Sequence, residues 1–155
     1  MNIRIIQLGK DKDSWLKEAV QEYQKRLKPF CKLEILQLPD ISVKETGNSE
    51  LVKSKEGRAV LKKIEPTDHV VLLDERGLQK SSLEFSRFLT NISEAKRIVF
   101  VIGGVFGSSN ELKDIANDCL SLSRMTFTHR MTRLILVEQI YRAMMINSGR
   151  QYHIE

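Results

Sequence analysis

The stretch from Val99 to Gly107 constrains the fold of this chain most strongly. It reads Val-Phe-Val-Ile-Gly-Gly-Val-Phe-Gly, so four β-forming residues run directly into a glycine-rich turn. An apolar run without polar alternation is typical of a strand that is buried on both faces of a parallel sheet. Ligands of open α/β sheets bind at the carboxyl ends of such strands. The glycines there would let the backbone turn sharply and approach a ligand closely.

Strand-like and helix-like segments alternate along the rest of the chain. The predicted strands cover residues 3–8, 33–38, 69–74, 97–102 and 119–123. The predicted helices cover residues 14–27, 50–64, 111–117 and 132–147. A further helix is predicted to begin at the capping-box pair Ser81 and Glu84. Residues 40–49 are predicted to form a loop, and a polar turn is expected through Gly77. This alternation predicts an α/β fold with a mostly parallel sheet flanked by helices.

Length and composition narrow the class of protein. A chain of 155 residues predicts a single domain, here residues 1–155. No apolar run is long enough to span a membrane, and the first residues lack the features of a signal peptide, so we expect a cytoplasmic protein. Cys31 and Cys119 lie far apart in the sequence among apolar neighbours, which predicts buried free thiols and no metal site.

Positive charge is concentrated toward the end of the chain. The formal net charge is +5, and from Leu120 onward five arginines stand against two glutamates. The guanidinium group binds phosphate in a planar, two-pronged geometry, so arginines in this number favour a polyanionic partner. A solvated basic surface is the alternative explanation.

The predicted final helix, residues 132–147, is apolar around most of its circumference. Such a helix must be buried nearly all round, and a domain of this size has little interior to spare. We therefore predict that the helix forms the interface of a two-fold dimer. The alternative is a helix that is enclosed within one chain.

The glycine spacing does not by itself identify a ligand. Gly103, Gly104 and Gly107 follow the pattern G-G-x-x-G after the fourth predicted strand, whereas the dinucleotide motif is G-x-G-x-x-G after the first. No Gly-Lys-Ser/Thr follows, which argues against a phosphate-binding loop of the P-loop type. A tight structural turn and a ligand-binding loop are equally compatible with this spacing.

Two further segments carry residues suited to chemistry. Residues 120–133 first alternate Leu and Ser and then become rich in hydroxyl groups and Arg. This pattern suits a loop that binds the edge of a purine between apolar walls. An edge strand followed by a helix cap is the alternative interpretation. His129 in this segment is a candidate proton acceptor or anion contact, or else a capping residue. Tyr152 and His153, close to the end of the chain, suit stacking and hydrogen bonding with a nucleobase.

Together these segments resemble the RlmH family, small bacterial 23S rRNA methyltransferases of the SPOUT superfamily. The resemblance rests on Phe100-Val-Ile-Gly-Gly, Leu120-Ser-Leu-Ser-Arg-Met-Thr-Phe-Thr-His, Val137-Glu-Gln-Ile-Tyr-Arg and Tyr152-His153. The opening Ile-Gln-Leu-Gly-Lys, Glu22-Tyr-Gln-Lys-Arg-Leu and Lys55-Glu-Gly extend it over essentially the full chain. Thr128 stands where the family has proline, and Val105 and Phe106 are bulkier than the family pattern.

The resemblance implies a homodimer with a carboxyl-terminal trefoil knot that binds S-adenosylmethionine. It implies methylation of N3 of pseudouridine 1915 in 23S rRNA within the assembled ribosome, without a metal. The donor contacts carried over by position are Leu73, Gly103, Leu122, Ser123, Arg124, Met125, Thr126 and Phe127.

Methyl transfer of this kind is an in-line displacement in which the imide-type nitrogen must first lose its proton. A nearby cation favours the deprotonated base, and Arg142 and His129 are the candidates for this role. Tyr152 and His153 would place the base. Arg124, Arg130 and Arg133 would hold RNA phosphates. One alternative is a non-catalytic RNA- or ribosome-binding dimer of the same fold. Another is a nucleotide-binding enzyme with an ordinary Rossmann sheet, which the positions of the glycines disfavour.

Overall fold

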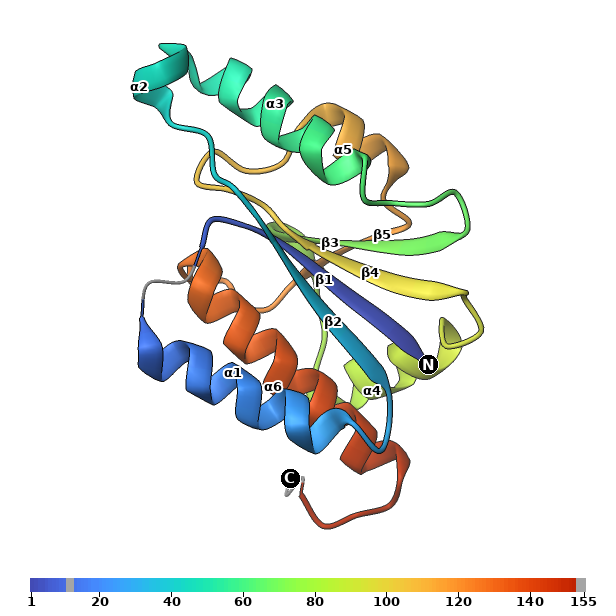
Figure 1. The fold of residues 1–155 in the computed structure, drawn as a ribbon. Helices are drawn as coiled ribbons and strands as arrows, with labels where there is room; N and C mark the ends of the chain where they lie inside the picture. Colours follow the sequence, from blue (N-terminus) through green and yellow to red (C-terminus); the bar gives the residue numbers. More distant parts are fainter. Residues whose placement is uncertain (11–12, 153–155) are drawn as a thin grey trace.

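The computed structural model describes residues 1–10 and 13–152, which form three layers (Figure 1). A central sheet has α1, α4 and α6 on one face and α2, α3 and α5 on the other. The strands are β1 (Asn2–Leu8), β2 (Lys32–Leu38), β3 (Asp68–Gln79), β4 (Arg97–Ile102) and β5 (Asp118–Ser121). The helices are α1 (Ser14–Leu27), α2 (Val43–Thr46), α3 (Ser49–Leu61), α4 (Ser82–Asn91), α5 (Asn110–Ile115) and α6 (His129–Asn147).

The five strands are arranged in the order β2-β1-β4-β3-β5, and every pair of neighbours is parallel. This confirms the predicted α/β fold. Strand β4 lies in the middle of the sheet, and Val99, Phe100 and Val101 are completely buried. Ile102 at its carboxyl end is in register with Gln7 of β1 and Leu73 of β3. The glycine-rich turn therefore leaves the sheet directly beside Leu73 of β3, where the pairing of β3 with β5 becomes irregular.

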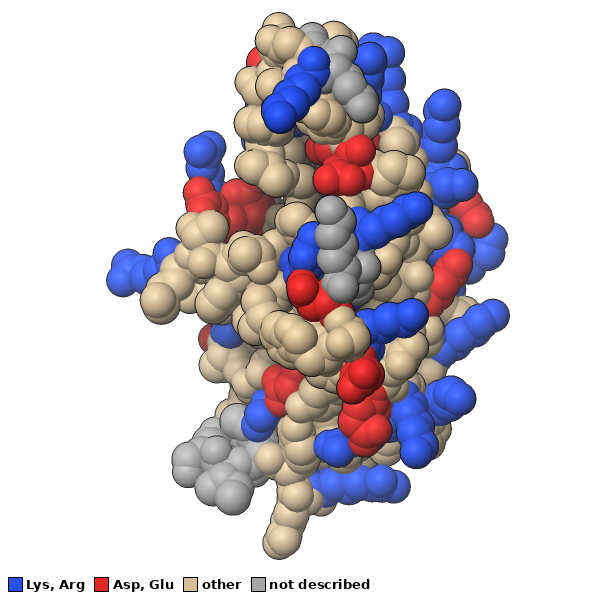
Figure 2. Space-filling model, turned by 60° about the vertical axis from the view of Figure 1, so that its left-hand side comes forward, with Lys and Arg blue, Asp and Glu red and all other residues tan. Residues whose placement is uncertain are grey.

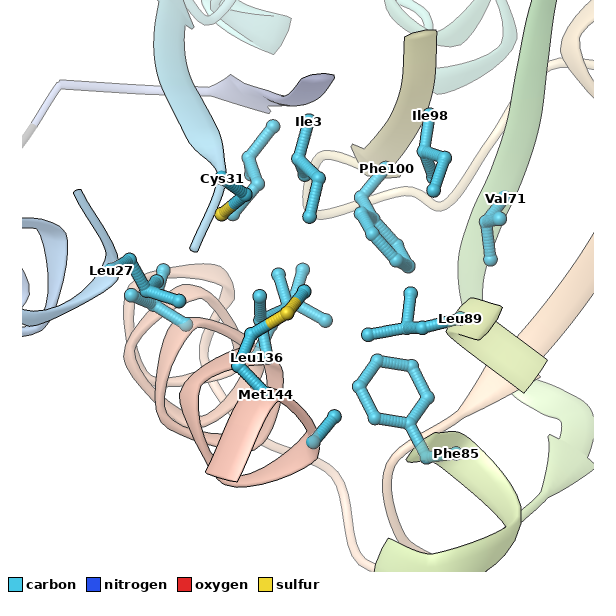
Figure 3. Close-up of a cluster of buried hydrophobic side chains, with 14 of the residues drawn as sticks. Ile3, Leu27, Cys31, Val71, Phe85, Leu89, Ile98, Phe100, Leu136 and Met144 are labelled. Atoms are coloured by element: carbon cyan, nitrogen blue, oxygen red, sulfur yellow. The ribbon is translucent and has the colours of Figure 1, made fainter. Parts of the chain in front are cut away.

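An apolar cluster covers each face of the sheet. The larger one joins β1, β3 and β4 to α1, α4 and α6, and Figure 3 shows Leu136 and Met144 of α6 facing Phe100 and Leu89 across it. The smaller one packs α3 and α5 against the opposite faces of the same strands. Burying a side chain the size of Leu or Phe contributes about 1.5–3 kcal/mol, so these two clusters hold the layers together.

Helix α6 lies under the sheet between α1 and α4 (Figure 1). Leu136, Val137 and Ile140 are completely buried, so one chain already encloses the sheet-facing side of this helix. Ile135 and Arg142 remain half-buried. The helix begins at residue 129 rather than 132, because the Thr128 hydroxyl accepts a hydrogen bond from the Met131 N–H (3.4 Å) and caps the first turn.

The predicted turn through Gly77 is wrong, because β3 continues to Gln79. The pairing of β3 with β5 shifts register between Leu73 and Leu78. A Cβ atom on Gly77 would lie 2.6 Å from the Leu120 backbone carbon, so the glycine permits the two strands to approach each other.

Other boundaries also differ from the prediction. The segment 40–49, predicted as a loop, contains the short helix α2, which Ser42 caps through a hydrogen bond from the Lys44 N–H. Cys31 is buried as predicted, but Cys119 is exposed because β5 is an edge strand. In the described part of the chain, no helix is both long and apolar enough to cross a membrane.

Replacing Gly77 with Ala should destabilise the fold by about 1–3 kcal/mol, because the added methyl group would force the backbones of β3 and β5 apart. Urea unfolding monitored by circular dichroism measures this change. Leu78→Ala is the matched control on the same strand, because its side chain is 72% exposed and its loss should change the free energy of unfolding by less than about 0.5 kcal/mol. Equal stabilities of the two variants would contradict the prediction.

Candidate functional site

A cavity of about 790 Å³ opens at the carboxyl ends of β4 and β5, beside the irregular middle of β3. Three stretches that are far apart in the sequence form most of its wall: residues 73–76, residues 102–108, and residues 120–123, 125–129 and 132. Lys53 of α3 and Lys113 of α5 complete the lining. The cavity therefore occupies the edge of the sheet at which ligands of α/β proteins bind.

The glycine-rich turn is both a tight turn and a wall of this cavity. The Gly107 N–H donates a hydrogen bond to the Gly104 carbonyl (3.0 Å), and Gly107 adopts a φ of +79°, which favours glycine. A Cβ atom on Gly103 would lie 3.0 Å from the Ser108 Oγ. Small residues are thus needed for the turn to close, and the closed turn presents bare backbone to the cavity.

The buried carboxylate of Glu56 supports the turn from behind. Its side chain is 4% exposed, and its Oε1 accepts a hydrogen bond from the Ile41 N–H (3.0 Å). Its Oε2 lies 2.5 Å from the position that a Cβ atom on Gly104 would occupy. Burial raises the pKa of Glu56, and the hydrogen bond from Ile41 opposes this shift. Sequence reasoning assigned no role to Glu56, because a glutamate within a weakly amphipathic helix gives no signal of burial.

Hydroxyl groups shape the loop that follows β5. The Ser121 hydroxyl donates to the Ser123 carbonyl (2.9 Å), and the Ser123 hydroxyl accepts from the Met125 N–H (2.9 Å). The Thr126 hydroxyl donates to a Glu75 carboxylate oxygen (3.1 Å) and so ties the loop to β3. These bonds leave Met125 exposed at the cavity. The segment thus combines both predicted arrangements, an edge strand with a helix cap and a wall of a binding cavity.

His129, the first residue of α6, also lines the cavity. Its Nε2 lies 3.1 Å from the position of a Cβ atom on Gly9, and Gly9 adopts a φ of +87°. The imidazole therefore packs against the backbone at the end of β1, where a larger residue would displace it. This contact fixes the ring at the edge of the cavity.

A second cluster gathers on α6 and on the segment after it. An oxygen of Glu138 pairs with the Arg142 guanidinium (2.6 Å) and accepts a hydrogen bond from the Tyr152 hydroxyl (3.3 Å). The Arg142 Cζ lies 4.9 Å from the centre of the Tyr152 ring, and Tyr141 packs edge-on against the same ring. We call Glu138, Tyr141, Arg142 and Tyr152 the α6–tail cluster. Burial and the neighbouring Tyr23 and Glu138 raise the pKa of Tyr152, so its phenol stays protonated at neutral pH.

One chain does not bring the two groups of predicted residues together. The cavity contains Leu73, Gly103, Leu122, Ser123, Met125, Thr126, Phe127 and His129. Arg142 follows His129 by thirteen residues on the same helix, which corresponds to about 20 Å. Arg124 is exposed and is not among the cavity-lining residues, and His153 lies outside the described part of the chain.

Two of the three arginines expected to hold RNA phosphates, Arg130 and Arg133, occupy different environments. Arg130 is half-buried and pairs with Asp13 of the segment before α1 (2.9 Å). Arg133 is only 1% exposed, so its side chain lies within one chain and not on an open surface. It falls on the same helical face as Leu136, Val137 and Ile140, which follow it by three, four and seven residues and are buried.

Glu56 should make stability depend on pH. Its pKa in the folded chain lies above the ordinary value of 4.5, so the folded chain binds this proton more tightly than the unfolded chain does. The free energy of unfolding should therefore fall as the pH rises upward from about 4.5, because ionised Glu56 is disfavoured in the folded state. Urea unfolding of the natural chain and of Glu56→Gln across this range measures the effect. If the difference in free energy of unfolding between the natural chain and Glu56→Gln stays constant with pH, the prediction is contradicted.

Comparison with known proteins gives consistent matches over the full chain. A family model described as "Predicted SPOUT methyltransferase" matches residues 1–153. Proteins named ribosomal RNA large subunit methyltransferase H are 43% identical in Lactobacillus delbrueckii subsp. bulgaricus, 42% in Latilactobacillus sakei and 43% in Bacillus anthracis, each over 99% of both chains.

A solved structure of a probable methylase family protein from Haemophilus influenzae superimposes with a TM-score of 0.61. The match covers 99% of this chain and 71% of that one, at 11% identity. At such low identity, the superposition shows a common fold and does not indicate the substrate.

Proposed function

Because the chain belongs to the SPOUT methyltransferase family, as a large-subunit rRNA methyltransferase of the RlmH type, we propose that it methylates N3 of pseudouridine 1915 in 23S rRNA. The proposed donor is S-adenosylmethionine, and the proposed substrate is the assembled ribosome, which places the protein in the cytoplasm. The observation that carries the proposal is the cavity, which brings Leu73, Gly103, Leu122, Ser123 and residues 125–127 together although they are far apart in the sequence.

The cavity suits a donor that consists of a nucleoside and an amino acid. Its volume of about 790 Å³ lies within the range of about 300–1,000 Å³ usual for small-molecule sites. Leu73, Leu120 and Leu122 supply apolar surface for a purine ring, and the glycine-rich turn offers backbone groups at close range. When bound there, S-adenosylmethionine supplies a methyl group on a positively charged sulfur.

The α6–tail cluster suits the acceptor base. The N3 of pseudouridine must be deprotonated before it is methylated, and a guanidinium nearby lowers the pKa of such an acid. Glu138 holds the Arg142 guanidinium in place through the 2.6 Å pair. Tyr152 adds an aromatic face and a phenol that stays protonated and can donate a hydrogen bond. His129 lies at the cavity, where it can contact the reacting groups.

Two copies of the chain would complete the site. About 20 Å of α6 separate His129 from Arg142, so the cavity of one protomer requires the α6–tail cluster of another. We therefore propose a two-fold homodimer in which α6 forms the interface, with each protomer a single domain whose carboxyl-terminal part is knotted. In that arrangement Arg142 and Tyr152 of each protomer act on the donor held by its partner.

The direct test of the reaction is methyl transfer from labelled S-adenosylmethionine to intact ribosomes and to naked rRNA, followed by mapping of the modified base. The expected result is one methyl group on N3 of the target pseudouridine. Ribosomes should be methylated much better than naked rRNA, because so small a chain recognises a particle that is already folded. No heat of binding in calorimetry with S-adenosylmethionine at high concentration would instead favour a non-catalytic RNA- or ribosome-binding dimer.

Replacing Arg142 with Ala should abolish methyl transfer and leave donor binding unchanged, because Arg142 lies outside the cavity of its own chain. Calorimetry with S-adenosylmethionine measures binding, and labelled transfer to ribosomes measures activity. Arg87→Ala, an exposed arginine on α4, removes the same charge and should retain full activity. Natural turnover by Arg142→Ala would overturn the role assigned to this residue.

Hybrid dimers should recover activity from two inactive variants. Leu122→Arg blocks the cavity, and Arg142→Ala removes the cation, so neither variant alone should transfer methyl groups. In a mixed dimer, the intact cavity of one chain meets the intact Arg142 of the other. An equal mixture refolded together should show about a quarter of the natural activity, because half of the dimers contain one complete site. No recovery at all would contradict a site shared between protomers.

A further inference from the structure

A second hollow, of about 620 Å³, lies between the carboxyl-terminal half of α1 and the start of β2. We call it the lysine groove, after the three exposed lysines in its wall, Lys25, Lys28 and Lys32. The other lining residues are Gln21, Gln24, Cys31 and Leu33. The groove thus combines cations and carboxamide groups around a small apolar floor.

The carboxylates closest in sequence to the groove are occupied by arginines outside it. Glu22 pairs with Arg26 (2.8 Å), and Glu34 pairs with Arg4 (2.8 Å). No carboxylate occurs among the lining residues. Glu22 also interacts with Lys25, so an acidic side chain compensates part of the groove's charge from outside its wall. Figure 2 shows Lys and Arg side chains along one edge of the face it draws, with Asp and Glu side chains between them.

The position of these lysines is only partly explained by helix stability. Cations near the carboxyl terminus of a helix interact favourably with its dipole, which accounts for Lys25 and Lys28 at the end of α1. Lys32 belongs to β2 and gains nothing from that dipole. Bringing three like charges around one groove costs free energy unless an anion compensates it, so the groove fits a polyanion.

Helix α1 separates the groove from the α6–tail cluster, since Tyr23 and Arg26 lie on the opposite helical face from Lys25 and Lys28. Tyr23 of α1 packs against Tyr141 (ring centroids 5.9 Å apart), and Arg26 lies over both rings. On the same end of the molecule, the Arg150 guanidinium lies 5.1 Å from the centre of the Phe30 ring, just before the groove-lining Cys31. The end of the groove at Cys31 thus lies near Arg150, which stands two residues before Tyr152 of the α6–tail cluster.

We propose that the lysine groove binds the phosphate backbone of 23S rRNA outside the target nucleotide, an inference that rests on the proposed function. Lysine is a compact point charge that suits phosphate contacts without sequence preference. The groove anchors the RNA strand that leads to the base held by Arg142 and Tyr152. It raises the affinity for the ribosome and takes no part in methyl transfer itself.

The test compares two triple variants of the full chain that lose the same charge. Lys25→Gln, Lys28→Gln and Lys32→Gln remove the groove cations. Lys44→Gln, Lys55→Gln and Lys62→Gln remove three exposed lysines from α2, α3 and the end of α3, on the other face of the sheet. Thermal unfolding checks that both fold, and calorimetry with S-adenosylmethionine checks that donor binding is intact.

The groove variant should bind large ribosomal subunits about tenfold more weakly than the control at low salt. The slope of log affinity against log salt concentration should become shallower by about two to three, since each phosphate contact contributes about 0.7–0.9. The KM for ribosomes should rise while kcat stays unchanged. An affinity and slope equal to those of the control, or a loss confined to kcat, would overturn the proposal. The salt dependence of binding can be measured even if no methyl transfer occurs. Failure of the groove proposal can therefore be distinguished from failure of the proposed reaction.

Discussion

Burial of β4 in the middle of a parallel sheet is the constraint on which the rest of the structure depends. Val99, Phe100 and Val101 contact neighbours on both faces, so helices must cover the sheet above and below. Because all strands run in the same direction, the turn after β4 emerges beside Leu73 of β3 and the carboxyl end of β5. The cavity at this edge is therefore a consequence of how the strands are ordered.

The glycines and the buried carboxylate at this edge act together. The turn closes only because Gly103 and Gly104 carry no side chain, and Glu56 fills the space behind Gly104. Glu56 also holds the Ile41 backbone, so one carboxylate links α3, the segment before α2 and the turn after β4. The binding wall is thus supported from the second layer of helices, at a cost in burial that appears as the raised pKa of Glu56.

Helix α6 combines a structural and a chemical role. Its sheet-facing side completes the larger apolar cluster, its first residue lines the cavity, and its last turns carry the α6–tail cluster. A straight helix keeps its two ends apart, so a single protomer cannot use both for one reaction. The proposed dimer resolves this, and the lysine groove, on the other side of α1 from the cluster, adds a second basic surface for the RNA.

The sequence by itself determined most of the strands and helices, and the family. The continuous apolar run before Gly103 predicted a central strand, the capping pattern of Ser81 and Glu84 predicted the start of α4, and local periodicity was enough because these signals lie within a few residues of each other. Only the tertiary structure decided which residues face inward. Arg133 is buried, Cys119 is exposed and Gly77 lies within a strand, because helix phase, edge position and strand pairing depend on contacts between distant segments. The same reason separates His129 from Arg142: the predicted helix 132–147 contained only Arg142, and the structure shows that α6 begins at His129 and puts about 20 Å between the two residues.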